Sequence, residues 1–328
     1  MEFTSYEQIN DFRLQGIALA SRNNHELNDF HDQVYELVIS LALRRMNISY
    51  GDPPSSFTFF VMGSAGRFEQ SIWSDQDHGI VFETNNDESK KYFIHLGHEI
   101  SDGLERAGYP KCSGGVMAGN PLWCKPMTEW KAQIHKWTAE SSWESIRYLL
   151  IFADSRPLYG TTSLLMSIKK EYSSSIEKEH LIRRMLQNTM HIKKGVGVLG
   201  QLLVETHGNF SGSINLKDTA FFPYVNAARL LALNEKITET STLSRLTLVS
   251  QNAMPSDKSI FFAKNFSRLL EFRLLYGNHH NYESGHYVNG DNLTKSERKE
   301  LKALLKSGEL LYYNVKGQIE KENQYGNE

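Results

Sequence analysis

The sequence predicts an α+β fold, in which a small mixed β-sheet with flanking helices precedes a helical C-terminal domain. Two short apolar segments, 57–62 and 78–83, have the length and composition of buried strands. From about residue 128 onward, apolar residues recur mainly at helical spacing. A sheet-containing part followed by a helical part indicates the α+β class.

The first elements are expected to be helical, over residues 5–48. Leu27, Val34 and Leu41 lie there at helical spacing, and the Gly-Asp-Pro-Pro sequence that begins at Gly51 ends the helix. Between the two strands lies a polar segment that is treated separately below. A second helix is expected over 88–107.

A glycine-rich region follows this second helix. It is expected to form a turn at Gly108 and then a loop over 109–122, with a short strand near Gly115. The remaining helices are expected at 128–139, 142–153, 163–172, 178–206, 219–234, 239–251 and 256–275. After a loop over 277–292, Thr294 and Glu297 form the pattern of a capping box, which predicts the start of the last helix.

The length of 328 residues suggests about two domains. We expect a helical N-terminal segment at 1–50, a core that carries the chemistry at 51–160, and a helical C-terminal domain at 161–328. The C-terminal domain is expected to close a cleft and to bind the substrate that accepts the transferred group.

Charge and cysteine content exclude several classes of protein. The chain has 36 Lys+Arg and 38 Asp+Glu residues and a net charge of -2, so binding of long nucleic acid is not expected. Cys112 and Cys124 have the spacing of neither a disulfide framework nor a zinc site, which favours a reducing compartment. The N-terminus resembles no signal peptide and no segment is apolar enough to span a membrane. A cytoplasmic protein without membrane partners is therefore expected.

The segment between the two predicted strands carries the clearest chemical signal. Gly63 and Ser64 follow the first strand, where a turn lets the backbone approach a ligand closely. Residues 65–71 are expected to open a short helix whose N-terminal amides favour a phosphate. Asp75 and Asp77, called the acid pair below, precede the second strand and point to one face of it, since they are two residues apart. Two adjacent carboxylates suit Mg²⁺, and a phosphate site beside Mg²⁺ suits phosphoryl or nucleotidyl transfer.

This string of residues resembles the signature of the DNA polymerase beta-like nucleotidyltransferase superfamily. The fuller pattern Gly-Ser-x-Gly-Arg-x-Glu-Gln, followed by Ser-Asp-Gln-Asp-His, is similar to the nucleotidyltransferase family related to the PII-protein uridylyltransferase. Stretches at 112–123, 152–160 and 216–233 are also similar to that family, and the resemblance extends from about residue 15 to about residue 310.

The resemblance implies roles for individual residues. Gly63 and Ser64 would hold a nucleoside triphosphate, and the acid pair would bind one or two Mg²⁺ (or Mn²⁺) ions. Arg67 would either neutralise phosphate charge in catalysis or form a structural ion pair with Glu69. Lys217 would contact a phosphate as a point charge, with a solvent-facing cation as the alternative.

The third carboxylate that the superfamily often carries has no clear counterpart. Asp154 could reach the site, although an ion pair with Arg156 or a role at a helix end is at least as plausible for it. The general base that would deprotonate the acceptor is therefore left open. His279, His280 and His286 lie in a loop rich in asparagine and glycine, and only weakly suggest a metal site.

The sequence thus predicts a Mg²⁺-dependent enzyme that transfers a nucleoside monophosphate from an NTP to a hydroxyl acceptor and releases pyrophosphate. Nothing in the sequence identifies the base of the nucleotide, ATP and UTP included. The resemblance implies a protein tyrosine as one acceptor, as in PII uridylylation. The alternatives are a nucleotide-binding regulator with weak or no catalytic activity, and a protein-interaction module.

Overall fold

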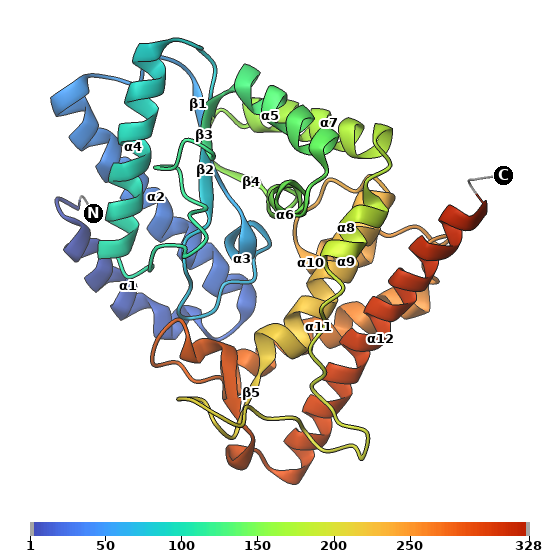
Figure 1. Cartoon of the computed structure of the whole chain (residues 1–328). Coiled ribbons are helices and arrows are strands. Elements are labelled where there is room, and N and C mark those ends of the chain that lie inside the picture. The colour runs from blue at the N-terminus through green and yellow to red at the C-terminus, as the bar shows by residue number, and fades with distance from the viewer. Residues whose placement is uncertain (1–2, 326–328) are drawn as a thin grey trace. The chain divides into compact units, whose positions relative to one another are not determined.

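The computed structural model describes residues 3–325 and divides the chain into two compact units (Figure 1). The first unit comprises the chain up to Glu140 together with Ile151–Ser175. The second comprises Ser141–Leu150 and the chain from Ile176 onward. The domain boundaries expected at residues 50 and 160 stay sequence predictions.

A mixed four-stranded sheet forms the centre of the first unit, in the order β3-β2-β1-β4. Strand β1 pairs antiparallel with both β2 and β4, whereas β2 and β3 run parallel. The strands are β1 Phe57–Val61, β2 His78–Phe82, β3 Cys124–Pro126 and β4 Arg156–Gly160.

Helices cover both faces of this sheet because the side chains of β1 alternate between two apolar environments. Phe57, Phe59 and Val61 join the core formed with three helices, α1 Tyr6–Ala20, α2 Asn24–Tyr50 and α4 Asp87–Arg106. Phe60 points the other way and contacts the ring of Trp130 on α5 Met127–Glu140, with ring centroids 5.7 Å apart. Figure 1 shows α2 and α4 on one side of the sheet and α5 on the other.

The chain enters the second unit for the first time in α6, which spans Trp143–Phe152. It then returns to the first unit, where β4 completes the sheet and α7 Thr162–Lys178 begins. The first unit is therefore built from two separate stretches of sequence.

Helices dominate the second unit. The long helix α12 packs against α9 and α11, and α10 packs against α9 and α11. The elements are α8 Ile182–Asn188, the short strands β5 Ser213–Asn215 and β6 Tyr287–Asn289, the π-helical turn η1 Lys217–Phe221, α9 Phe222–Asn234, α10 Thr242–Leu248, α11 Ser256–Tyr276 and α12 Lys295–Tyr325.

The predicted α+β class is confirmed, and so is the capping box that starts α12. The backbone N–H of Thr294 donates to the Glu297 carboxylate at 2.7 Å, and the N–H of Glu297 donates back to the Thr294 hydroxyl at 3.3 Å. The two buried strands also occur where the sequence predicts them.

Several local predictions are wrong. Of the helix predicted over 178–206, only α8 Ile182–Asn188 forms beyond the end of α7 at Lys178, and the chain is irregular from Thr189. Further on, Gly195, Gly197 and Gly200 disfavour a return to helix. The helical region predicted over 5–48 forms as two helices, α1 and α2, and Asn23 caps the start of α2 with its side chain. The strand expected near Gly115 is absent from the described residues there, and the third strand is β3 instead.

Within residues 3–325, none of the helices combines the length and the apolar character that crossing a membrane requires.

Candidate functional site

A one-turn helix, α3 Gly63–Gly66, connects β1 to the polar segment that precedes β2. Gly63 has a φ of 55°, a left-handed conformation that favours glycine. A Cβ atom at this position would lie only 2.1 Å from Oδ2 of Asp77. The absence of a side chain at residue 63 is therefore what lets the turn and the Asp77 carboxylate approach each other.

The short helix predicted over 65–71 is wrong, because the helical turn ends at Gly66. Phe68 has a φ of 58°, which a helix does not allow. Two asparagines of α2 hold this part of the chain: the Asn24 amide donates to the Phe68 carbonyl at 2.8 Å, and the Gln70 N–H donates to the Asn28 amide oxygen at 2.9 Å. The polar segment thus follows α2 instead of continuing as a helix.

The acid pair lies in extended backbone just before β2, with alternating side chains as the sequence predicts. Gln76 and His78 are fully buried, whereas Asp75 and Asp77 are partly exposed. The Gln76 amide donates to the carbonyls of Ser101 and Tyr109 at 3.1 and 3.0 Å. This residue between the two acids therefore anchors the segment to the core.

His78 completes the same anchor in its neutral form. The backbone N–H of Ala118 donates to Nδ1 of His78 at 3.1 Å, so the ring proton lies on Nε2 and is donated to the Gln76 oxygen at 2.8 Å. Burial lowers the pKa of His78 to about 3. With Gln76 and His78 fixed on one side of the chain, the acid pair is directed to the opposite side.

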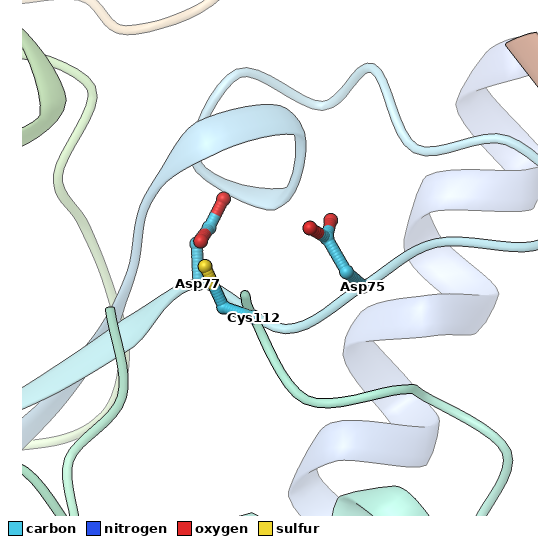
Figure 2. Close-up of side chains that lie close together, drawn as sticks. All are labelled: Asp75, Asp77 and Cys112. Carbon is cyan, nitrogen blue, oxygen red and sulfur yellow. The ribbon is translucent and has the colours of Figure 1, made fainter. Parts of the chain in front are cut away.

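The carboxylates of the acid pair converge, and a third side chain joins them. One carboxylate oxygen of Asp75, one of Asp77 and the sulfur of Cys112 all lie within 4.8 Å of one another. Figure 2 shows the three side chains approaching from two chain segments, next to the α3 turn. The N–H of Met62 donates to the Asp77 carbonyl at 2.8 Å, which ties the end of β1 to this cluster.

Sequence reasoning did not place Cys112 in the site. Burial raises the pKa of its thiol to about 12, and the negative charge of Asp77 acts in the same direction. The available signal was indirect, since Cys112 begins the stretch 112–123 that is similar to the nucleotidyltransferase family. The contact itself depends on the loop after Gly108, which returns beside the polar segment so that residue 111 pairs with Gln76. Nothing in the spacing of Cys112 and Asp77 reveals this pairing.

Arg67 forms a buried ion-pair network behind the turn. Its Nε donates to Glu69 at 2.7 Å and its Nη1 donates to Asp154 at 2.6 Å, and both carboxylates are almost fully buried. Burial opposes the positive charge, but these two carboxylates outweigh it and raise the pKa of Arg67. The Arg67–Glu69 pair expected as one alternative is confirmed, while a catalytic role for Arg67 stays a prediction.

The suggested ion pair between Asp154 and Arg156 is wrong. Arg156 instead donates two hydrogen bonds of 2.8 Å to Asp32 on α2, and a third of 3.1 Å to the Ala65 carbonyl. Its guanidinium carbon also lies 3.8 Å from the ring centroid of Phe68. Arg156 therefore holds the α3 turn and the following residues against α2.

Lys217 lies in the second unit, at the start of η1. Its ammonium nitrogen lies 3.4 Å from the Tyr282 hydroxyl and 5.6 Å from the centre of that ring. The histidines of the neighbouring loop are occupied locally: Nε2 of His279 bonds to the Leu274 carbonyl at 2.9 Å, and the His286 ring lies edge-on to Tyr282. Over the described part of the chain, these histidines belong to no cluster that could hold a metal ion.

A glycine turn beside two converging carboxylates is typical of enzymes that transfer phosphoryl or nucleotidyl groups with a divalent cation. Two family models, which together match most of the chain, fit it to a family of nucleotidyltransferases. The family model described as "Putative nucleotidyltransferase DUF294" matches residues 9–144, and the model described as "Putative nucleotidyltransferase substrate binding domain" matches residues 179–319. No curated protein matches the chain in sequence. The relation to the PII-protein uridylyltransferase stays a prediction.

Proposed function

We propose that the protein transfers a nucleoside monophosphate from an NTP to a hydroxyl acceptor, with release of pyrophosphate, and that it depends on Mg²⁺ or Mn²⁺. The observation that carries this proposal is the convergence of the acid pair beside Gly63, within a family of nucleotidyltransferases. Oxygen donors from one or two carboxylates are the usual protein contribution to a Mg²⁺ site that also binds substrate phosphates.

The residues of the site fit such a cation. Their donor atoms lie within 4.8 Å of one another. Two ligands of one Mg²⁺ ion lie at most about 4.2 Å apart at metal–oxygen distances of about 2.1 Å, so side-chain shifts of a few tenths of an ångström are enough to bring the donor atoms to one ion. When bound, a divalent cation neutralises phosphate charge and stabilises the charge that develops during transfer. The acid pair would hold the cation, and Gln76 would fix the backbone between the two acids.

The α3 turn would receive the triphosphate. Gly63 lacks a side chain that would cover the backbone, and the Ser64 hydroxyl lies 3.2 Å from the Ser74 hydroxyl, which links the turn to the segment of the acid pair. We assign Arg67 to positioning this turn through its two carboxylate partners, and a direct contact of Arg67 with phosphate stays the alternative.

Acceptor binding is assigned to the second unit, because the model that matches residues 179–319 is described as a substrate-binding domain. In this proposal Lys217 contributes a positive charge for a phosphate of the nucleotide. The acceptor hydroxyl would belong to a protein tyrosine, which follows from the resemblance to PII uridylylation and from no contact in the structure.

One observation favours a second candidate, a nucleotide-binding regulator without turnover. The third member of the cluster is a thiol, and Asp154, the acid considered as a third carboxylate, is paired with Arg67. A site with only two carboxylates could bind a nucleotide and its cation yet lack the general base for transfer.

The decisive experiment incubates the full chain with each of the four labelled NTPs, Mg²⁺ or Mn²⁺, and extract proteins as acceptors. Label transfer and pyrophosphate release are measured for the wild type, for the double variant Asp75→Asn plus Asp77→Asn, and for Asp102→Asn. Asp102 is a matched control because its side chain is 59% exposed and pairs with a surface lysine, Lys111.

We expect the double variant to lose transfer by at least about a hundredfold, the loss seen when one strong electrostatic contact to a transition state is removed. The Asp102 variant should retain wild-type activity. Transfer that survives in the double variant would contradict the site assignment. If the wild type binds nucleotide but transfers nothing, and the double variant no longer binds nucleotide, the result would favour the regulator.

A further inference from the structure

Cys112 is fixed beside the acid pair by backbone pairing on both sides of it. Before it, Lys111 pairs with Gln76, and the Gln76 N–H donates to the Pro110 carbonyl at 3.3 Å. After it, the N–H of His78 donates to the Val116 carbonyl at 3.0 Å. The thiol therefore belongs to the same framework as the two acids.

The cluster offers a cation two kinds of donor. Carboxylate oxygens are hard donors that suit Mg²⁺ and Mn²⁺, whereas a thiolate is a soft donor that suits Zn²⁺ and related ions. Zn–S and Zn–O bonds of about 2.3 and 2.1 Å place ligand atoms of one ion some 3–4.5 Å apart, which agrees with the 4.8 Å limit of this cluster. The Cys112 thiol, which hydrogen-bonds to the Asp77 side chain, therefore adds a soft donor to the two hard ones.

We infer that Cys112 is the third protein ligand of the cation held by the acid pair, so that the site binds thiophilic divalent cations such as Zn²⁺ and Co²⁺ more tightly than Mg²⁺. On binding, the sulfur–hydrogen bond breaks, the thiolate bonds to the cation, and the proton passes to solvent. In the presence of Mg²⁺, low concentrations of Zn²⁺ would then occupy the site. This inference rests on the proposed function only through the shared acid pair.

The test measures cation binding to the full chain without nucleotide, after treatment with a chelator. Co²⁺ is the probe, because a cobalt–thiolate bond gives a charge-transfer absorption in the near ultraviolet that carboxylate ligands do not give. Zn²⁺ affinity is measured by competition with Co²⁺, and Mn²⁺ affinity by calorimetry. The variants are Cys112→Ser, Cys112→Asp and Cys124→Ala.

Cys124 provides the matched control, because it is the other cysteine of the chain and is buried in β3. We expect the absorption band in the wild type and in Cys124→Ala, and its loss in Cys112→Ser. Zn²⁺ affinity should fall about tenfold or more in Cys112→Ser, as it does when supporting groups of a metal site are removed. Mn²⁺ affinity should stay nearly constant in Cys112→Ser and rise in Cys112→Asp.

Any of three results would overturn the inference: the absorption band persists in Cys112→Ser, the wild type shows no band, or the wild type and Cys112→Ser bind Zn²⁺ with equal affinity. Circular dichroism shows whether each variant is folded, and Cys112→Asp provides a second folded comparison. The two proposals fail separately: cation binding through sulfur can occur without nucleotidyl transfer, and transfer that needs the acid pair can occur without a sulfur band.

Discussion

Replacement of Gly63 by alanine should weaken both the fold and the binding of a cation. An alanine with a φ of 55° costs about 1 kcal/mol or slightly more. Its Cβ would lie 2.1 Å from Oδ2 of Asp77, so this carboxylate must leave its rotamer at a cost of about 0.5–1.5 kcal/mol. We therefore expect Gly63→Ala to lose about 2–3 kcal/mol of stability and about tenfold or more of Mn²⁺ affinity.

The control for this prediction is Gly51→Ala. Gly51 has a φ of 78°, and among the described residues no atom lies within 4 Å of the place its Cβ would take, so alanine there brings backbone strain without a displaced carboxylate. Urea unfolding gives the stability of both variants, and calorimetric titration with Mn²⁺ gives the affinity. If Gly63→Ala is destabilised but binds Mn²⁺ as the wild type does, the Gly63–Asp77 contact does not shape a cation site.

Three further predictions concern buried polar groups. Arg67→Met leaves two buried carboxylates without their cation and should lower the free energy of unfolding in urea by about 3–5 kcal/mol. Adding Asp154→Leu should recover part of this loss. The control is Arg106→Met, which removes an exposed ion pair, and a smaller loss in Arg67→Met than in this control would contradict the network. Gln76→Leu removes the donor of two buried carbonyls and should cost about 2–4 kcal/mol, whereas Gln76→Glu at low pH, where the acid can still donate, should be milder. His286 should make stability fall as pH decreases. Burial, and then nearby positive charges, lower its pKa to about 3, so below pH 6.5 the unfolded chain binds one more proton than the folded chain. The slope that His286→Phe removes between pH 6 and pH 4 should approach about 1.4 kcal/mol per pH unit, and an unchanged slope would refute the assignment.

The parts of the fold that follow from local patterns could be predicted from the sequence. The buried strands β1 and β2 show as apolar runs, and the capping box at Thr294 shows in four residues. The alternation that directs the acid pair to one side is also local, since it depends only on extended backbone. In the structure the two carboxylates also converge, as two side chains on one face can.

Other parts depend on contacts between distant residues. Arg67 and Asp154 are 87 positions apart, and no pattern near either residue indicates that they pair. Cys112 lies 35 positions after Asp77 and reaches it only through a loop whose path is set by pairing with Gln76. Strand β4 was missed because it is a partly exposed edge strand that contains a proline, Pro157, and has no apolar alternation.

Because the first unit is built from two separate stretches of sequence, it cannot be isolated as one continuous fragment. A fragment that ends at residue 144, where the first family match ends, would lack Ile151–Ser175. The outer edge of β1, now covered by β4, would be open to pairing with other chains, and Arg67 would lose Asp154. The part of the chain that carries the acid pair is therefore inseparable from sequence that lies beyond its own family match, and any exchange of halves between relatives would have to carry that sequence along.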